Sequence, residues 1–142
     1  MSYATYQYRK KRRRAVKLQG GLCFWCGGQM LTYEEANYNQ AHPLLCTSEH
    51  LIPQSVKKDN SQLNVVAACN GCNTARKDHP LETWLPRVVF RLKQAGNPGH
   101  LVTILQHLAK CGIAYAIGHP VTGPDTATAL HVPPQKEPTP AP

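Results

Sequence analysis

Residues 23–26, Cys-Phe-Trp-Cys, and residues 69–72, Cys-Asn-Gly-Cys, enclose the segment Ser-Glu-His-Leu-Ile-Pro at residues 48–53. A lone Cys-x-x-Cys pair could be a redox dithiol, but two such pairs are better explained by one tetrahedral metal site. Because such a site joins two segments that are distant in sequence, it decides the fold. We therefore expect a structural Zn²⁺ ion bound by four thiolates, those of Cys23, Cys26, Cys69 and Cys72.

The stretch between the two cysteine pairs exceeds the spacing of an ordinary zinc ribbon, so it must contain a folded insert. Residues 44–51 have the pattern of a strand that Pro53 ends, and residues 63–68 have that of a second short strand. A helix over residues 70–77 should follow. The expected order is strand, loop, strand and helix, with the zinc site at the base.

Helices are expected on both flanks of this core. Residues 6–19 lack Pro and Gly, and Gly20-Gly21 should end that helix. Apolar residues recur at helical spacing over 81–92, with an interruption at Pro86, and this stripe is typical of core packing. Asn97-Pro98 predicts the N-cap and first residue of a further helix, which Cys111-Gly112 closes.

The organisation that follows is α+β. We predict a basic N-terminal helix (1–20), a zinc-clipped core (21–80), a C-terminal helical extension (81–117) and a disordered Pro-rich tail (118–142).

The chain has 142 residues and a formal net charge of +8, and much of the excess lies in one block. The basic residues of this block are Arg9, Lys10, Lys11, Arg12, Arg13, Arg14 and Lys17. A polyanionic partner is the natural inference, since neutralising phosphates releases counterions. A solvated charge run or a localisation signal is the alternative.

No apolar face accompanies the block, no signal peptide precedes it and no membrane span is present, so we expect no membrane partner and a cytoplasmic location. Cys46 and Cys111 look like small hydrophobic residues.

An ordered string of motifs carries a resemblance to a known family. The string is Cys-x-x-Cys-Gly at 23–27, Glu-His-Leu-Ile-Pro at 49–53, and Leu-Asn-Val-Val-Ala-Ala-Cys-Asn-Gly-Cys-Asn at 63–73, with Lys77 four residues on. Over about residues 12–78 the chain resembles the HNH endonucleases. The resemblance implies a ββα-metal core and a DNA endonuclease that leaves 5′-phosphate and 3′-hydroxyl ends.

The resemblance also implies roles for individual residues. His50 matches the general base that deprotonates the attacking water. Glu49 and Asn73 match ligands of a catalytic divalent metal, and Asn64 matches the amide that ties the loop to the strand. Lys77 lies one helical turn after Asn73, placed to meet a phosphate.

Two departures from the family pattern bear on the metal. Asp is commoner than Glu before the motif His, and Asn73 stands where His is an alternative. Oxygen donors favour Mg²⁺ or Mn²⁺ as the catalytic ion. Because successive strand residues point to opposite faces, a bulge or strand end must re-aim Glu49 or His50 before both can face one metal.

Plainer interpretations stay open beside these roles. His50 can be a buried structural His, Glu49 can pair with a Lys or Arg, Asn73 can cap its helix, and Lys77 can be an ordinary exposed Lys. The rival function is a zinc-stabilised nucleic-acid-binding module that cuts nothing. The partner is expected to be double-stranded DNA, with RNA open as a substrate. A single site cuts one strand, so a homodimer or an accessory targeting subunit also stays open.

Overall fold

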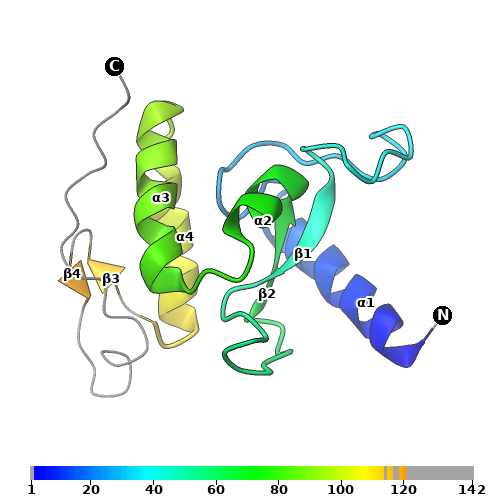
Figure 1. Cartoon of the computed structure of the whole chain (residues 1–142), viewed down its shortest axis with the longest axis horizontal. Helices are drawn as coiled ribbons and strands as arrows, with labels where there is room; N and C mark the ends of the chain where they lie inside the picture. Colours follow the sequence, from blue (N-terminus) through cyan, green and yellow to red (C-terminus); the bar gives the residue numbers. More distant parts are fainter. Residues whose placement is uncertain (1, 114, 117–118, 121–142) are drawn as a thin grey trace. The chain divides into compact units, whose positions relative to one another are not determined.

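The computed structural model describes residues 2–113, 115–116 and 119–120, and it divides the chain into two compact units, Met1–His79 and Pro80–Pro142 (Figure 1). The first unit contains α1 (Tyr3–Leu18), β1 (Cys46–His50), β2 (Val65–Cys69) and α2 (Asn70–Arg76). The α+β class is therefore confirmed.

The basic helix α1 begins three residues before its predicted start. The Ser2 hydroxyl accepts the backbone N–H of Thr5, which supplies an N-cap that the sequence pattern missed. Gly20 and Gly21 both have positive φ, 63° and 78°, and they end the helix as expected. Ala15 of α1 is buried in the first unit's core.

Strands β1 and β2 form a two-stranded antiparallel sheet in regular register, with Glu49 opposite Val66 and His50 opposite Val65. All of β2 is buried, which explains its continuous apolar sequence. The ladder contains no bulge between residues 46 and 50, and β1 ends at His50.

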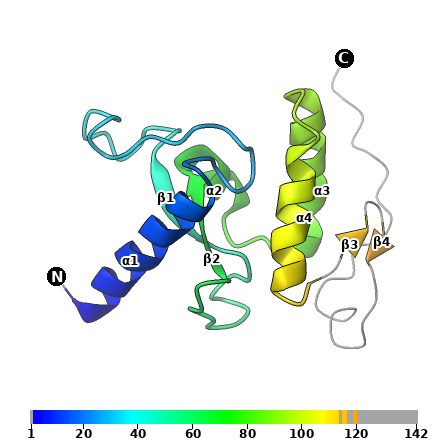
Figure 2. The same ribbon diagram turned by 180° about the vertical axis from the view of Figure 1, so that it is seen from behind.

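The two helices of the first unit cover opposite faces of this sheet. Thr47 and Glu49 share one face of β1 and contact Asn73 and Arg76 of α2, whereas His50 contacts the ring of Tyr8 in α1. In agreement, α1 lies behind the strand pair in Figure 1 and in front of it in Figure 2.

The second unit contains α3 (Leu81–Gln94), α4 (His100–Lys110) and the short antiparallel strands β3 (Tyr115–Ala116) and β4 (His119–Pro120). Contrary to the predicted interruption, α3 continues through Pro86. The buried apolar residues are Leu81, Trp84, Leu85, Val88, Leu92, Leu101, Ile104, Leu108 and Ile113.

The start of α4 differs from its prediction. Gly99, not Asn97, is the N-cap, and Asn97, Pro98 and Gly99 instead accept i→i+3 bonds that form a tight turn before His100. The predicted end holds, with Cys111 as C-cap and Gly112 at φ 78°. The predicted tail, apart from β4, lies outside the described residues. No helix among the described residues is long and apolar enough to cross a membrane.

Candidate functional site

The four cysteines of the two Cys-x-x-Cys pairs meet in one cluster, and their sulfur atoms all lie within 4.8 Å of one another. A tetrahedral Zn²⁺ with bonds of about 2.3 Å separates its thiolates by about 3.8 Å. The Sγ atoms of Cys26 and Cys69 are 4.0 Å apart, close to that separation. Backbone N–H groups of Gly28 and Cys72 point at the cluster sulfurs. The cluster therefore fits a zinc site.

Crowding of the four thiols makes thiolate available at this cluster. A hydrogen bond from Cys23 lowers the pKa of Cys69 to about 7, and the same neighbour lowers the pKa of Cys26 well below its usual range. The shared protons correspondingly raise the pKa of Cys23 and of Cys72. Because thiolates are the form that binds zinc, the cluster can load a metal near neutral pH.

Glu49, the residue expected to bind the catalytic metal, is buried and already has two partners. Its side chain is only 7% exposed and its Oε1 lies 3.5 Å from the Arg76 Nη1 atom. Its Oε2 accepts the indole N–H of Trp25 at 3.1 Å. Burial raises the pKa of Glu49, while Arg76 and Trp25 act in the opposite direction.

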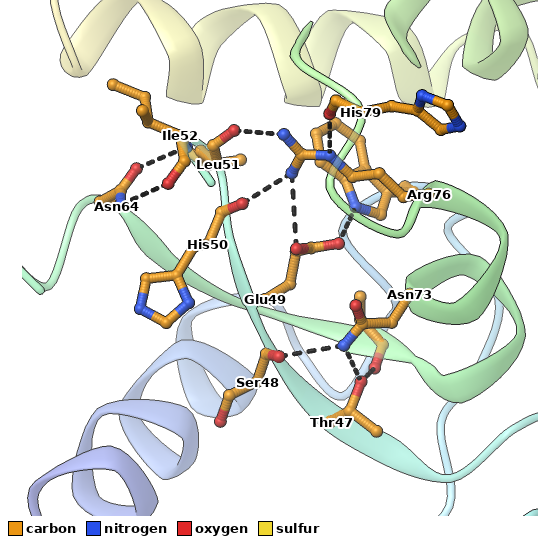
Figure 3. Close-up of polar contacts among 12 residues, drawn as sticks. Thr47, Ser48, Glu49, His50, Leu51, Ile52, Asn64, Asn73, Arg76 and His79 are labelled. Carbon is orange, nitrogen blue, oxygen red and sulfur yellow. Dashed lines mark hydrogen bonds and ion pairs between the residues drawn. The ribbon is translucent and has the colours of Figure 1, made fainter. Parts of the chain in front are cut away.

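Arg76, which enters from α2, is the most extensively bonded side chain of this region (Figure 3). It is fully buried, and its guanidinium donates to the carbonyl oxygens of His50 (2.6 Å), His79 (3.1 Å) and Leu51. It also lies over the Trp25 ring, 5.3 Å from the centroid. Burial lowers the pKa of Arg76, against the attraction of Glu49.

His50, the expected general base, lies in a different environment from Glu49. Its imidazole is half-buried and its Nε2 lies 3.1 Å from the Asn60 Oδ1 atom. The Gln54 amide nitrogen approaches the same Nε2 at 3.4 Å, and the Tyr8 ring meets the imidazole edge-on at 5.8 Å. The Tyr8 hydroxyl and Gln54 both donate to Asn60, so four side chains converge at the end of β1.

Asn64 and Asn73 both join the strand to another segment. The Asn64 oxygen accepts the N–H of Ile52 at 2.8 Å, and its amide nitrogen donates to the carbonyls of Ile52 and Asp59. The Asn73 amide nitrogen donates to the Thr47 hydroxyl and the Ser48 carbonyl, each at 3.0 Å. Asn64 therefore fastens the β1–β2 loop, and Asn73 fastens α2 to β1.

The charged residues expected at a phosphate occupy the surface. Lys77 is exposed as the C-cap of α2, with φ 55°. Lys11 and Arg12 are half-buried, and the remaining members of the basic block are exposed: Arg9, Lys10, Arg13, Arg14 and Lys17. The ammonium of Lys11 donates to the backbone carbonyl of Asn60, which places this charge beside the His50 cluster.

The structure thus brings the predicted residues to two faces of β1. Glu49 and Asn73 lie on the α2 face, and His50 lies among residues of α1 and the β1–β2 loop. Sequence reasoning missed Arg76 and Trp25 on the first face, and Tyr8 and Asn60 on the second. The sequence did contain a signal for Arg76. It lies three residues after Asn73 in the expected helix, so both side chains should share one helical face.

Comparisons with known proteins give limited similarity. No protein-family model matches the chain, and no curated protein matches it. Among solved structures the chain is similar to the Type II-C Cas9 enzyme from Actinomyces naeslundii, with a TM-score of 0.45 and 21% sequence identity. The match covers 74% of this chain and 11% of that one, so this chain matches only a small part of the Cas9 enzyme.

Proposed function

We propose that this protein is a DNA endonuclease that hydrolyses phosphodiester bonds, with His50 as its general base. The observation that carries the proposal is the placement of His50, a half-buried imidazole held at the end of β1 beside a basic helix. A general base needs access to water and a fixed orientation, and the Asn60 and Tyr8 side chains supply the second of these.

In this proposal the imidazole of His50 takes a proton from a water molecule as the water oxygen attacks phosphorus. The bond between phosphorus and the 3′ oxygen breaks, and the leaving oxygen takes a proton from solvent, so the products have 5′-phosphate and 3′-hydroxyl ends. The Asn60 oxygen can only accept, so its contact with Nε2 fits the tautomer that carries the ring proton on Nε2 and leaves Nδ1 to take the proton from water. Basic residues of α1 neutralise the flanking phosphates. Among them, Lys11 donates to the backbone carbonyl of Asn60, the residue whose side chain contacts His50.

The catalytic Mg²⁺ or Mn²⁺ that the family resemblance implies does not fit Glu49 as that residue lies. The carboxylate is buried against the positive charge of Arg76, which would repel a divalent cation at the same oxygen atoms. Asn73 has an amide oxygen to offer, but a single amide is a weak site. The proposed hydrolysis therefore contains no step on a metal at Glu49, and cleavage with and without added divalent ions tests whether one is required.

A zinc-stabilised nucleic-acid-binding module that does not cut is the second candidate. The ion pair between Glu49 and Arg76 favours it, because this pair occupies the acid that metal-dependent hydrolysis needs. Both candidates predict a zinc site and salt-sensitive binding of DNA, so only cleavage separates them.

The test is incubation of supercoiled plasmid with zinc-loaded protein at low salt, with Mg²⁺, Mn²⁺, Ca²⁺ or no added divalent ion. His50→Ala is the variant, and His107→Ala, in the second unit, is the matched control. We expect nicked or linear DNA with the native protein and the control, and none with His50→Ala. Plasmid that is bound but stays supercoiled under all four conditions would favour the binding module.

A further inference from the structure

Three features outside the proposed chemistry invite an interpretation: the exposed Tyr33–Tyr38 pair, the exposed Lys57-Lys58 tip of the β1–β2 loop, and the buried cluster of Arg76, Glu49 and Trp25. The first two are surface features without a contact that identifies a ligand. The third is buried, closed by several hydrogen bonds and directly connected to His50.

We propose that Glu49 acts as the buried counter-ion of Arg76, not as a metal ligand, and that the pair positions the backbone which carries His50. The proposal rests on the proposed function for the role of His50. It departs from the metal-ligand role that the family resemblance implies for Glu49.

Arg76 lies in the protein interior, where a charged group without partners destabilises the fold. Its guanidinium is fully buried, and desolvating a cation is compensated only by close, well-directed acceptors. Three backbone carbonyls supply dipoles, but Glu49 supplies the one opposite charge at this guanidinium among the described residues. Glu49 therefore has a structural reason to be acidic and buried.

The two oxygen atoms of Glu49 are both engaged, one near Arg76 and the other with the Trp25 N–H. Metal binding through this carboxylate would displace Arg76 from its fully buried position. Glu49 also faces α2, whereas His50 contacts α1, so a metal at Glu49 would lie across the strand from the imidazole.

The acceptors of Arg76 connect this pair to the general base. Nη1 donates to the carbonyl of His50 itself at 2.6 Å, and Nη2 donates to the carbonyl of Leu51. These carbonyls lie where β1 ends, and Asn64 holds the chain on their other side through Ile52 (Figure 3). Arg76 is thus a positioning residue, which fixes the backbone from which the His50 ring projects.

The first experiment compares Arg76→Met, Glu49→Gln and the double variant in the full, zinc-loaded chain. Arg76→Met leaves a buried carboxylate without its cation, so we expect its folding equilibrium constant to fall at least about tenfold. Adding Glu49→Gln should restore most of that loss, because the uncompensated charge is gone. Strict additivity of the two single effects would overturn the ion pair.

The second experiment measures Mn²⁺ binding by electron paramagnetic resonance. A metal ligand should cost at least about tenfold in affinity when it is replaced, whereas a counter-ion of Arg76 should not. We expect Glu49→Gln to bind Mn²⁺ within about threefold of the native protein. A larger loss overturns the proposal. If the native protein binds no Mn²⁺ specifically, Glu49 is no metal ligand, which agrees with the proposal.

The third experiment tests positioning in the double variant, which should stay folded but lacks the hydrogen bonds to His50 and Leu51. We expect kcat to fall about 10- to 100-fold with little change in KM. The His50 ring-proton chemical shift should also move, because the Tyr8 ring lies against it. An unchanged ring shift in a folded double variant overturns positioning. If the native protein cuts no DNA, the proposed function fails, while the stability and chemical-shift results still decide this inference.

Discussion

Trp25 donates its indole N–H to the Glu49 carboxylate across 3.1 Å, and this bond ties the first cysteine pair to β1. Trp25 is 1% exposed, so the carboxylate cannot exchange this donor for water. Trp25→Phe removes the donor and also part of the buried ring, because phenyl is smaller than indole. We expect a loss of about 1–3 kcal/mol in the free energy of unfolding.

Chemical denaturation of the zinc-loaded protein measures this loss, provided that the m-value is unchanged. Tyr33→Phe is the control, because this aromatic residue is 43% exposed and should tolerate the change. Equal midpoints for both variants would mean that the Trp25–Glu49 bond contributes nothing in solution.

Zinc removal should unfold the first unit. Four cysteines hold chain segments 46 residues apart within one small cluster, whereas the sheet beneath them has only two strands. We expect Cys72→Ser to lose bound zinc and far-ultraviolet circular dichroism signal, and Cys111→Ser to keep one zinc per chain. Zinc analysis by atomic emission and circular dichroism measure the two effects, and full zinc retention by Cys72→Ser would contradict the four-ligand assignment.

Zinc retention should fall as the pH falls. Hydrogen bonding lowers the pKa of Cys69 to about 7, below its ordinary value. A lowered folded-state pKa contributes stability that is present above the unfolded-state pKa and is lost as the pH falls through the folded-state value. Bound zinc competes with protons and moves that loss to still lower pH. A zinc indicator followed through an acid titration measures the release, and tighter retention at lower pH would contradict the expectation.

Glu49 should produce a pH dependence of the opposite sign. Burial raises its pKa, so its contribution to stability is fully present below the unfolded-state pKa and is lost as the pH rises through the raised value. We therefore expect Glu49→Gln to gain stability relative to the native protein as the pH rises from below the unfolded-state pKa through the raised folded-state value. Denaturation midpoints across this range measure the difference.

Glu35→Gln is the control of opposite sign for that experiment. A hydrogen bond from the Thr32 backbone lowers the pKa of Glu35, so stability from this group is present above the unfolded-state pKa and is lost as the pH falls. If the stabilities of Glu49→Gln and Glu35→Gln, each relative to the native protein, changed with pH in the same direction, the two carboxyls would not have the opposite pKa shifts that the structure implies.

The sequence predicted those elements whose signals are local. The Cys-x-x-Cys pairs predicted the sulfur cluster, and Gly20-Gly21 predicted the end of α1. Local rules also contained signals that went unused: Thr32 and Glu35 form a capping box, in which each side chain accepts the other's backbone N–H. The predicted start of α4 was wrong because Asn97 begins a turn that precedes the helix.

The arrangement of the candidate site depended on contacts between distant segments. Alternation along β1 predicted that Glu49 and His50 diverge, but it could not say which residue meets each of them. Arg76 becomes a partner of Glu49 only when α2 packs on β1, and Asn60 reaches His50 only when the β1–β2 loop folds back. Such pairings depend on tertiary geometry, which periodicity and motif spacing do not encode.

Gln19 should stabilise the free edge of β2. Its amide nitrogen donates to the carbonyl of Ala67 and its amide oxygen accepts the N–H of Ala67, so the side chain imitates a neighbouring strand. We expect Gln19→Ala to cost about 1–3 kcal/mol, because it leaves the buried N–H of Ala67 without its partner, whereas the Ala67 carbonyl keeps the N–H of Phe24. Gln106→Ala, at an exposed position of α4, is the control, and thermal unfolding of both measures the difference.

The basic helix α1 should account for the salt dependence of DNA binding. Arg13, Arg14 and Lys17 are exposed, and each phosphate contact adds about 0.9 to the slope of log K against log salt concentration. We expect the triple Gln variant to lower that slope by up to about three, with weaker binding to every sequence tested. Fluorescence anisotropy with a labelled duplex at several salt concentrations measures it.

The matched control for α1 is Lys110→Gln, which removes an exposed charge from α4 in the second unit. If the charges act only through the net charge of the chain, each charge removed from α1 should weaken DNA binding as much as the charge removed at Lys110. If α1 contacts the phosphates directly, only the α1 substitutions should lower the slope. Equal slopes for the native protein and the triple variant would assign the basic block to solvation or localisation. The nucleic acid would then have to be held elsewhere, with the exposed Lys57 and Lys58 as the next positions to neutralise.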